Sequence, residues 1–219
     1  MFNKTALVTG MVAMMSTGAA FAGSIVNTLH NQSGAIWNTT GEICVICHAP
    51  HNGVAAGNGP LWNHDLSTVS SYTMYQDPNG TIDGVIDGTP SGPSVLCLSC
   101  HDGTVAVDAY GGKVNPGAYI TDPNKILGTD LSNDHPISIT YDDTTAGTDG
   151  ALFPPSTTNV VIGDPADETK SGTIQDLMTF GGKVQCPSCH DVHGKFAYTT
   201  ALLKRDRSGS AICLTCHNK

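Results

Sequence analysis

Hydrophobic positions in this chain rarely show the regular spacing that predicts long helices or strands. Residues 76–94, QDPNGTIDGVIDGTPSGPS, and residues 142–170, DDTTAGTDGALFPPSTTNVVIGDPADETK, are interrupted by Gly, Pro, Asp and Asn, which favour turns. Residues 199–217, TTALLKRDRSGSAICLTCH, fit two short helical turns. The pattern predicts an irregular fold, mostly coil with short helices.

One apolar run lies near the N-terminus. Residues 6–20, ALVTGMVAMMSTGAA, follow the basic start MFNK and precede AFA, which has the small residues of a signal-peptidase site before Gly23. The run is too short and too interrupted to span a bilayer, and no other stretch is apolar enough. We therefore expect residues 1–22 to be a cleaved signal peptide and the rest to have no membrane span. The protein is expected to be secreted, extracellular or on the cell surface, with the periplasm as the alternative.

The composition predicts a poor side-chain core. The chain has 25 Gly, 12 Pro and only 6% aromatic residues, and its formal net charge is −9. Loss of residues 1–22 removes one lysine and no acidic residue, which leaves −10. This charge argues against a nucleic-acid partner and favours simple solubility or basic and cationic, metal-bearing partners.

All eight cysteines fall into the pattern Cys-x-x-Cys-His, which is the attachment site of c-type haem. Each pair of thiols can add to the two vinyl groups of one haem, and the adjacent histidine supplies the proximal iron ligand. Tetrahedral zinc or disulfides would also use paired cysteines, but neither requires a histidine directly after every second cysteine. The four motifs are Cys44, Cys47 and His48; Cys97, Cys100 and His101; Cys186, Cys189 and His190; and Cys213, Cys216 and His217.

We therefore expect four covalently bound haem c groups. Four large apolar macrocycles can supply the interior that the side chains lack, so the expected fold is a haem-cored multihaem cytochrome c that does not form without its cofactor.

The order of cysteines and histidines occurs twice. Each half has a lone histidine, a Cys-x-x-Cys-His-x-x-His motif and a second Cys-x-x-Cys-His motif. We expect residues 23–120 and 121–219 to be two dihaem halves of one compact tetrahaem unit. His64 has no histidine counterpart in the second half, so it is the spare one. The histidines that remain for the distal iron positions are His30, His51, His135 and His193.

Two imidazoles on every iron would leave no open coordination position. His51 and His193 follow their own motifs too closely to reach the distal face of the same haem, so each is expected to ligate a neighbouring one. Methionine is the other common sixth ligand, but only Met74 and Met178 lie outside the expected signal peptide. Which distal histidine serves which iron stays open at this point. Saturated irons favour an electron-transfer protein over an enzyme.

Several segments carry a resemblance: GEICVICHAPHNG, PLWNHDLS, LCLSCHDGTVAVDAYGG, DLSNDHPISI and AICLTCHN. They are similar to the doubled-CXXCH multihaem cytochromes, and most similar to the filament-forming tetrahaem outer-membrane cytochromes of metal-reducing bacteria. The resemblance covers residues 30–217 and is weakest in the Gly- and Asp-rich loops. It implies polymerisation into extracellular filaments, with a ligand that can be donated across the subunit boundary. His30 or another first-half histidine is the candidate for that ligand.

Three functions are compatible with these residues. The first is a secreted electron conduit that self-assembles head to tail and passes electrons to other multihaem cytochromes and to extracellular metal or electrode-like acceptors. The second is a monomeric periplasmic tetrahaem electron shuttle. The third is a multihaem reductase acting on nitrite, hydroxylamine or a sulfur oxyanion, which would need an iron with an open position.

Overall fold

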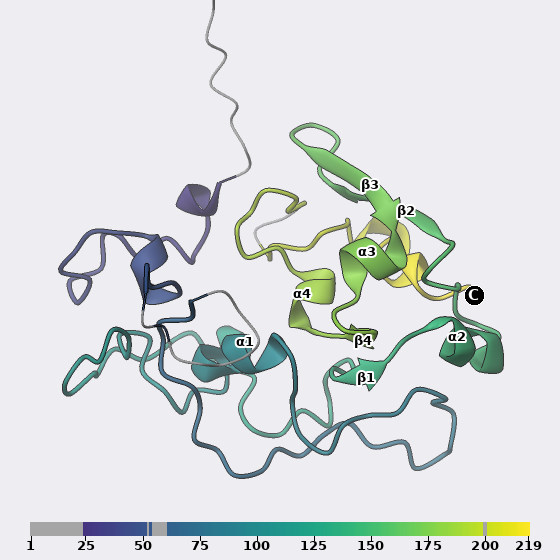
Figure 1. Ribbon diagram of the computed structural model, residues 1–219, viewed down its shortest axis with the longest axis horizontal. Coiled ribbons are helices and arrows are strands. Elements are labelled where there is room, and N and C mark those ends of the chain that lie inside the picture. The colour runs from purple at the N-terminus through teal and green to yellow at the C-terminus, as the bar shows by residue number, and fades with distance from the viewer. Residues whose placement is uncertain (1–23, 52, 54–60, 199–200) are drawn as a thin grey trace, which may run out of the picture.

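The computed structural model describes residues 24–51, 53, 61–198 and 201–219, so the expected signal peptide lies outside the described residues. The described chain is mostly coil with short elements, as the hydrophobic pattern predicted (Figure 1). No helix among these residues is both long and apolar enough to cross a membrane. The elements are η1 (Ile25–Asn27), η2 (Cys44–Ile46), α1 (Ser94–His101), η3 (Pro123–Lys125), β1 (Ile139–Thr140), α2 (Asp143–Asp149), β2 (Asn159–Gly163), β3 (Thr169–Thr173), α3 (Ile174–Met178), β4 (Lys183–Val184), α4 (Cys186–Cys189), η4 (Ser208–Ser210) and η5 (Cys213–Thr215).

Residues 142–170 are more regular than their turn-rich composition predicted. They hold α2, β2 and the start of β3, and β2 pairs with β3 as an antiparallel hairpin. Along β2 the side chains of Val160 and Ile162 are buried while Val161 is exposed, which is the alternation of a strand with one face on a core. Most of the turn-forming residues lie at or between the ends of these elements, and Gly147 is accommodated inside α2.

Helix α2 shows how such residues delimit an element. The Asp142 side chain accepts a hydrogen bond from the Thr145 amide at the N-terminus, and Gly150 ends the helix at φ 70°. Ser, Thr, Asp and Asn are preferred helix N-caps, and glycine readily adopts the left-handed conformation after the last turn. The predicted helical turns near the C-terminus are present as η4 and η5.

Two small apolar clusters form the side-chain core. The larger one packs β2 against α3 and lies in the second half of the chain, and the smaller one joins Met74 and Leu98 of the first half to Leu131 of the second. Met178 belongs to the larger cluster and Met74 to the smaller, so both methionines pack among apolar side chains. The buried members are Tyr141, Ala146, Val160, Ile162, Ile174, Leu177 and Met178 in the larger cluster, and Met74, Leu98 and Leu131 in the smaller.

The four Cys-x-x-Cys-His motifs follow one another across the molecule. Figure 1 shows η2, α1, α4 and η5, which carry the motifs in chain order, proceeding from left to right, with the C-terminus near the right-hand edge. Helices α1 and α4, from different halves, lie in contact at the centre.

An ion pair also joins the two halves. The Lys183 ammonium group on β4 donates to both carboxylate oxygens of Asp87 at 2.6 and 2.5 Å, and the Ser91 hydroxyl donates to Asp87 Oδ2 at 2.6 Å. These hydrogen bonds, with that from Lys183 the strongest influence, hold the pKa of Asp87 below its usual range. Both charged side chains are partly exposed, at 30% for Lys183 and 27% for Asp87, so water screens the pair.

We expect Asp87→Asn to lower the free energy of unfolding by about 0.5–1 kcal/mol at pH 7, the range of a partly exposed ion pair with good geometry. Because the folded-state pKa of Asp87 is depressed, its contribution is present above the ordinary aspartate pKa of about 3.9 and is lost as the pH falls through the lower folded-state value. Denaturant unfolding of the holoprotein at pH 7 and at strongly acidic pH measures the difference.

The exposed Asp83→Asn change removes the same charge nearby and serves as the control. A double-mutant cycle with Lys183→Met isolates the pair. A coupling energy of zero at pH 7 would show that the ion pair contributes nothing to the junction of the halves.

Candidate functional site

Each Cys-x-x-Cys-His motif folds as a helical turn. The backbone N–H of the motif histidine donates to the carbonyl of the first cysteine in η2 (His48 to Cys44, 2.8 Å) and η5 (His217 to Cys213, 3.0 Å). The same bond forms at α4, while the second motif occupies the end of α1. Residues i, i+3 and i+4 share one face of a helix. The turn therefore presents two thiols and one imidazole together, which is what attachment and ligation of one haem require.

All eight cysteines are free thiols. Those of successive motifs lie close enough to influence one another. The thiols of Cys97 and Cys186 are hydrogen-bonded, which raises the pKa of Cys97 and lowers that of Cys186. Burial raises the pKa of Cys100 to about 12, and the Cys47 thiol adds to the rise. Motif 1 thus adjoins motif 2, and motif 2 adjoins motif 3.

The third and fourth motifs continue this order. Burial raises the pKa of Cys216 to about 11, and the Cys189 thiol contributes in the same direction. The four attachment points therefore form a line in chain order, in agreement with the left-to-right sequence of helices in Figure 1.

Three of the four motif histidines face a histidine from outside the motifs. The ring centroids of His30 and His101 are 6.1 Å apart, with an angle of 63° between the ring planes. His48 and His193 are 6.2 Å apart at 13°. His135 and His217 are 6.4 Å apart at 73°. In each pair the histidine from outside the motifs, which is His30, His193 or His135, belongs to the set expected at the distal positions.

These separations fit two imidazoles on opposite sides of one iron. With metal–nitrogen distances of about 2 Å, such ligands have ring centroids about 6 Å apart. Ordinary aromatic pairs span similar distances, so the distance alone does not distinguish ligand pairs from other ring contacts. The identity of the two histidines in each pair does. All three pairs join a motif histidine to an expected distal histidine. The pairing of His193 with His48 also fits the expectation that this histidine serves a neighbouring haem.

Two motif histidines have a hydrogen bond that fixes the ring. His101 Nδ1 lies 2.7 Å from the Lys125 carbonyl oxygen, and His190 Nδ1 lies 2.8 Å from that of Ala201. A carbonyl only accepts, so Nδ1 carries the proton in both rings and Nε2 is the nitrogen with a lone pair. Metal-bound histidines in proteins are commonly oriented by such a bond from the other ring nitrogen.

His30 lies in an environment that protein atoms do not complete. Its Nδ1 is buried and has no hydrogen-bond partner among the described residues, and such buried polar atoms are rare. Burial lowers the pKa of His30 to about 4, with smaller contributions from the imidazoles of His101, His190 and His193. The ring is therefore neutral at pH 7, which is the form that binds metals.

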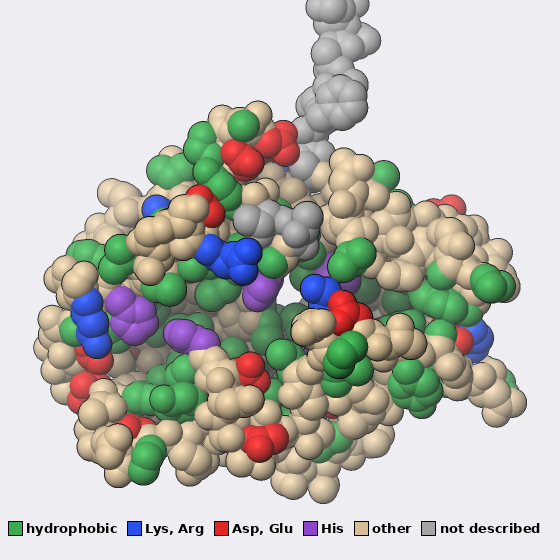
Figure 2. Space-filling model, turned by 180° about the vertical axis from the view of Figure 1, so that it is seen from behind, with side chains coloured by type: hydrophobic (Ala, Val, Ile, Leu, Met, Phe, Trp, Pro, Cys, Tyr) green, Lys and Arg blue, Asp and Glu red, His purple; other side chains and the backbone are tan. Residues whose placement is uncertain are grey.

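A hollow lies beside the third motif. Cys186, Cys189 and His190 border a cavity of about 190 Å³ with His135, and apolar side chains complete its wall. Figure 2 shows histidine side chains gathered in a hollowed band across one face of the molecule. The thiols, the His190 imidazole and the apolar side chains are groups that a haem attached at motif 3 would contact, and the cavity itself is smaller than that group. The apolar wall is formed by Leu127, Leu131, Ile137 and Val184.

Each half contains the same backbone bridge behind its first motif. We name the contact of residues 47–49 with 61–63 the first bridge and that of residues 189–191 with 202–204 the second bridge. Both are antiparallel and both begin at a leucine with positive φ, 51° at Leu61 and 58° at Leu202. The bonds are Ala49 N to Leu61 O (2.8 Å) and Asn63 N to Cys47 O (3.0 Å) in the first bridge, and Asp191 N to Leu202 O (2.7 Å) and Lys204 N to Cys189 O (2.8 Å) in the second.

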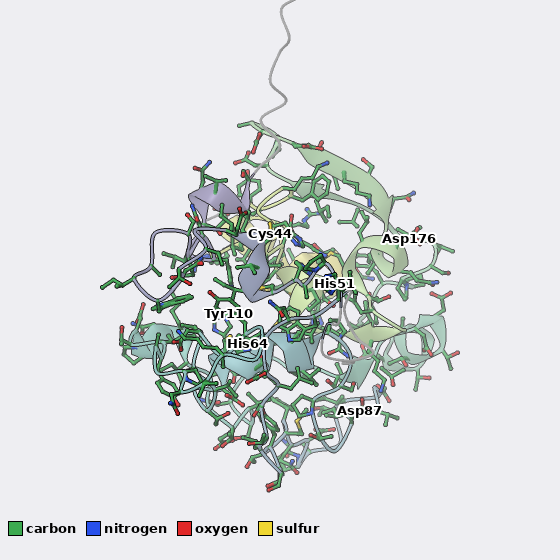
Figure 3. All side chains as sticks on the ribbon, turned by 60° about the vertical axis from the view of Figure 1, so that its left-hand side comes forward. Cys44, His51, His64, Asp87, Tyr110 and Asp176 are labelled. Carbon is green, nitrogen blue, oxygen red and sulfur yellow. The ribbon has the colours of Figure 1, made fainter. Side chains whose placement is uncertain are left out.

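The bridges show which residue corresponds to His64. His64 follows Asn63 as Arg205 follows Lys204, so its counterpart is an arginine, which a comparison of histidines alone could not reveal. His64 is 0% exposed, so it is not an ordinary surface histidine. It forms an isolated bridge with Tyr110, and Figure 3 shows the two residues together.

The structure thus brings three of the expected distal histidines, His30, His135 and His193, against a motif histidine. His30 lies against His101 of its own chain and His135 lies against His217 of the last motif. The expectation that His30 crosses to another subunit is therefore not supported. In the part of the chain that the structure describes, no three His, Cys, Asp or Glu side chains converge as a protein-only metal site would require.

Comparison with known proteins gives one match. Residues 180–219, which contain the third and fourth motifs, match the family described as "Doubled CXXCH motif". No curated protein matches the chain. The match supports a multihaem c-type cytochrome with covalently bound haem c and an electron-transfer role. It does not extend to the narrower group of filament-forming tetrahaem cytochromes.

The pairing predicts a distinct spectrum for each haem. His48 and His193 have nearly parallel rings, whereas the other two pairs are closer to perpendicular. The angle between axial imidazoles sets the splitting of the iron orbitals. We expect one rhombic low-spin signal and at least two strongly anisotropic ones in the electron paramagnetic resonance of the oxidised protein. His193→Ala should replace the rhombic signal by a high-spin signal equivalent to one haem.

His64→Gln is the control, because His64 belongs to none of the pairs and its replacement should leave every haem low-spin. Persistence of the rhombic signal in His193→Ala would contradict the pairing of His193 with His48.

Proposed function

We propose that this chain is a secreted tetrahaem c-type cytochrome that carries electrons and assembles head to tail into an extracellular filament. The observation that supports it most is the line of four motifs together with the three facing histidine pairs. A protein that holds four haems, each able to carry one electron, in sequence is suited to moving electrons along its length.

Haem, when bound, supplies a reversible one-electron couple at each motif. The cysteine pairs would hold the cofactor covalently, and the motif histidines would bind its iron, with Nε2 the available nitrogen in His101 and His190. His30, His193 and His135 would supply the second ligand at motifs 2, 1 and 4. Two histidine ligands would exclude water and substrates from the metal, so these residues favour electron transfer over bond chemistry. The Nδ1 bonds of His101 and His190 keep the rings oriented in both oxidation states.

The junction between the two halves supports continuation of the same arrangement beyond the chain. At this junction Ser94 is fully buried, its hydroxyl accepts from the Cys186 amide at 3.0 Å, and the Cys97 and Cys186 thiols touch. Ser94 lies three positions before the first cysteine of motif 2. The residue three positions before the first cysteine of motif 4 is Ser210, and it is exposed.

The corresponding cysteines behave in the same way. Cys213 corresponds to Cys97 and Cys44 to Cys186, and both Cys213 and Cys44 are exposed. The residues that are covered at the internal junction thus have exposed counterparts at the two ends of the line. A second copy can repeat the junction there, with the fourth motif of one chain against the first motif of the next. Such a contact does not close on itself and produces a fibre.

The partners follow from the ends and the charge of the fibre. Other multihaem cytochromes can deliver electrons to an exposed terminal motif, and extracellular metal or electrode-like acceptors can receive them. The net charge of −9 favours cationic, metal-bearing acceptors. Export is supported by the signal-like residues 1–22, because haem is attached to c-type cytochromes outside the bacterial cytoplasm.

Ser210→Arg tests the assembly. An arginine at this exposed end position should obstruct the next subunit, so we expect electron microscopy of the extracellular fraction to show fibres for the wild type and dispersed particles for the variant. Thr169→Arg, on the exposed tip of the β2–β3 hairpin, is the matched control and should form fibres. Haem content should stay at four in all three proteins.

Dispersed wild-type particles confined to the periplasm would instead identify a monomeric shuttle. A high-spin, cyanide-binding haem in intact fibres would contradict full ligation and point to a reductase.

A further inference from the structure

A buried polar network connects the two halves where α1 meets α4. Helix α1 ends with motif 2 and α4 carries motif 3, and the two helices lie in contact. The residue directly before α4 is Gln185, which is 2% exposed, and its partners Ser94 and Ser138 are 0% exposed. A polar group without a partner is costly at such depth. The hydrogen bonds of this network therefore constrain how the halves can pack.

The side chain of Gln185 is the centre of the network. Its Oε1 accepts from the Ser94 hydroxyl at 2.5 Å and from the Ser138 hydroxyl at 3.3 Å, and its Nε2 donates to Ser91 Oγ over a longer distance of 3.4 Å. Its backbone N–H donates to Ser188 Oγ, in the first turn of α4, at 2.8 Å. One residue thus contacts α1, the segment before α1, the segment before β1, and α4.

The donors and acceptors at the edge of the network fix the orientation of the carboxamide. The Cys186 backbone N–H can only donate, and it donates to Ser94 Oγ at 3.0 Å, which leaves the hydroxyl hydrogen of Ser94 for Gln185 Oε1. The carboxylate of Asp87 accepts from the Ser91 hydroxyl at 2.6 Å, so Ser91 Oγ accepts from Gln185 Nε2. The hydrogen bonds are therefore satisfied with the amide oxygen toward α1 and the amide nitrogen toward Ser91.

The backbone around the carboxamide is built to approach it closely. A Cβ atom on Gly92, which has φ 54°, would lie 3.0 Å from Gln185 Nε2, so a larger residue there would crowd the amide. Ser138 also has a positive φ of 57°, and its N–H donates to the Val184 carbonyl at 2.8 Å. Such conformations persist only where the surroundings enforce them. The network is thus a constrained site and not a loose set of surface contacts.

The network lies between the first cysteines of motifs 2 and 3. Ser94 precedes Cys97 by one turn of α1, and Cys186 directly follows Gln185 and bonds to Ser94 through its own N–H. Gln185 and Cys186 also border the cavity beside motif 3. Apolar burial is not directional, whereas hydrogen bonds have a preferred length and angle. The polar contacts therefore determine how the attachment points of the two halves are oriented relative to each other.

We propose that Gln185 is a positioning residue that sets the spacing and orientation of motifs 2 and 3, and thereby the path by which an electron crosses between the halves. The inference rests on the proposed electron-transfer function and names a determinant of it that lies outside the iron ligands. When an electron crosses, the iron at one motif is oxidised from ferrous to ferric, the iron at the other is reduced from ferric to ferrous, and no bond forms or breaks. Such a transfer weakens steeply with separation, so supporting hydrogen bonds that fix the geometry control it.

The test is Gln185→Met in the intact tetrahaem protein, because methionine keeps the length of the side chain and loses the carboxamide. In the electron paramagnetic resonance of the oxidised protein, the magnetic interaction between the motif 2 and motif 3 irons should weaken, while the signals of motifs 1 and 4 stay unchanged. His30→Ala identifies the motif 2 signal. Hydrogen exchange of the peptide 183–190 should become about tenfold faster, the effect of leaving one buried hydrogen-bonding group without its partner.

Two matched controls separate positioning from general stabilisation. Gln175→Met makes the same change at an exposed position of α3 and should alter neither measurement. Ser94→Ala is compared with Ser99→Ala, because both serines are fully buried in α1 but the Ser99 hydroxyl donates to the Leu96 carbonyl of its own helix at 2.6 Å. A merely structural role would make both serine variants less stable with the magnetic interaction intact. A positioning role weakens the interaction in Ser94→Ala alone.

The outcomes also distinguish this inference from the proposed function. An unchanged interaction in Gln185→Met with four haems would overturn the positioning role, while fibres would still support the conduit. If Gln185→Met fails to mature, the serine variants decide, and an equal interaction in Ser94→Ala and Ser99→Ala would overturn the inference. Absence of any interaction between the two irons in the wild type would overturn it as well. A weakened interaction in a protein that never forms fibres would support positioning and contradict the filament.

Discussion

Three pairs of facing histidines join distant parts of the chain, and these contacts organise the molecule. The pairs join residues 30 and 101, 48 and 193, and 135 and 217, so every pair links segments distant in sequence. The side-chain clusters are small by comparison, with three buried residues in one and seven in the other. Ligation can therefore supply the long-range contacts that a larger hydrophobic core supplies in other folds.

The sequence predicted the features that depend on local spacing. The four motifs and the predominance of coil follow from residue types at short separations, and the histidine pattern also selected His30, His135 and His193, which lie against motif histidines. The β2–β3 hairpin was missed because glycine, proline and aspartate were interpreted as interrupting the segment, whereas Gly163 and Asp164 end β2 and open its turn. Turn-forming residues can mark the boundaries of helices and strands as readily as they mark segments that lack them.

The partners within each histidine pair could not be predicted, because they depend on how the halves pack. Arg205 was missed as the counterpart of His64 for a different reason. The two residues differ in type, and their correspondence becomes visible only through backbone bonds from residues 61–63 and 202–204 to the motif segments. A repeat search based on identical residues cannot find a position at which the two halves carry different residue types.

The leucines that begin the two bridges differ in how far burial of the side chain offsets the strain of a positive φ. Left-handed backbone costs a residue with a Cβ atom about 1–2 kcal/mol, and it persists only where the surroundings enforce it. Leu202 is 9% exposed, so burial of its side chain offsets this strain, whereas Leu61 is 50% exposed and gains much less. The first bridge is consequently the less stable of the two, and local opening on heating or in denaturant begins in the first half of the molecule, at the end that bears Cys44.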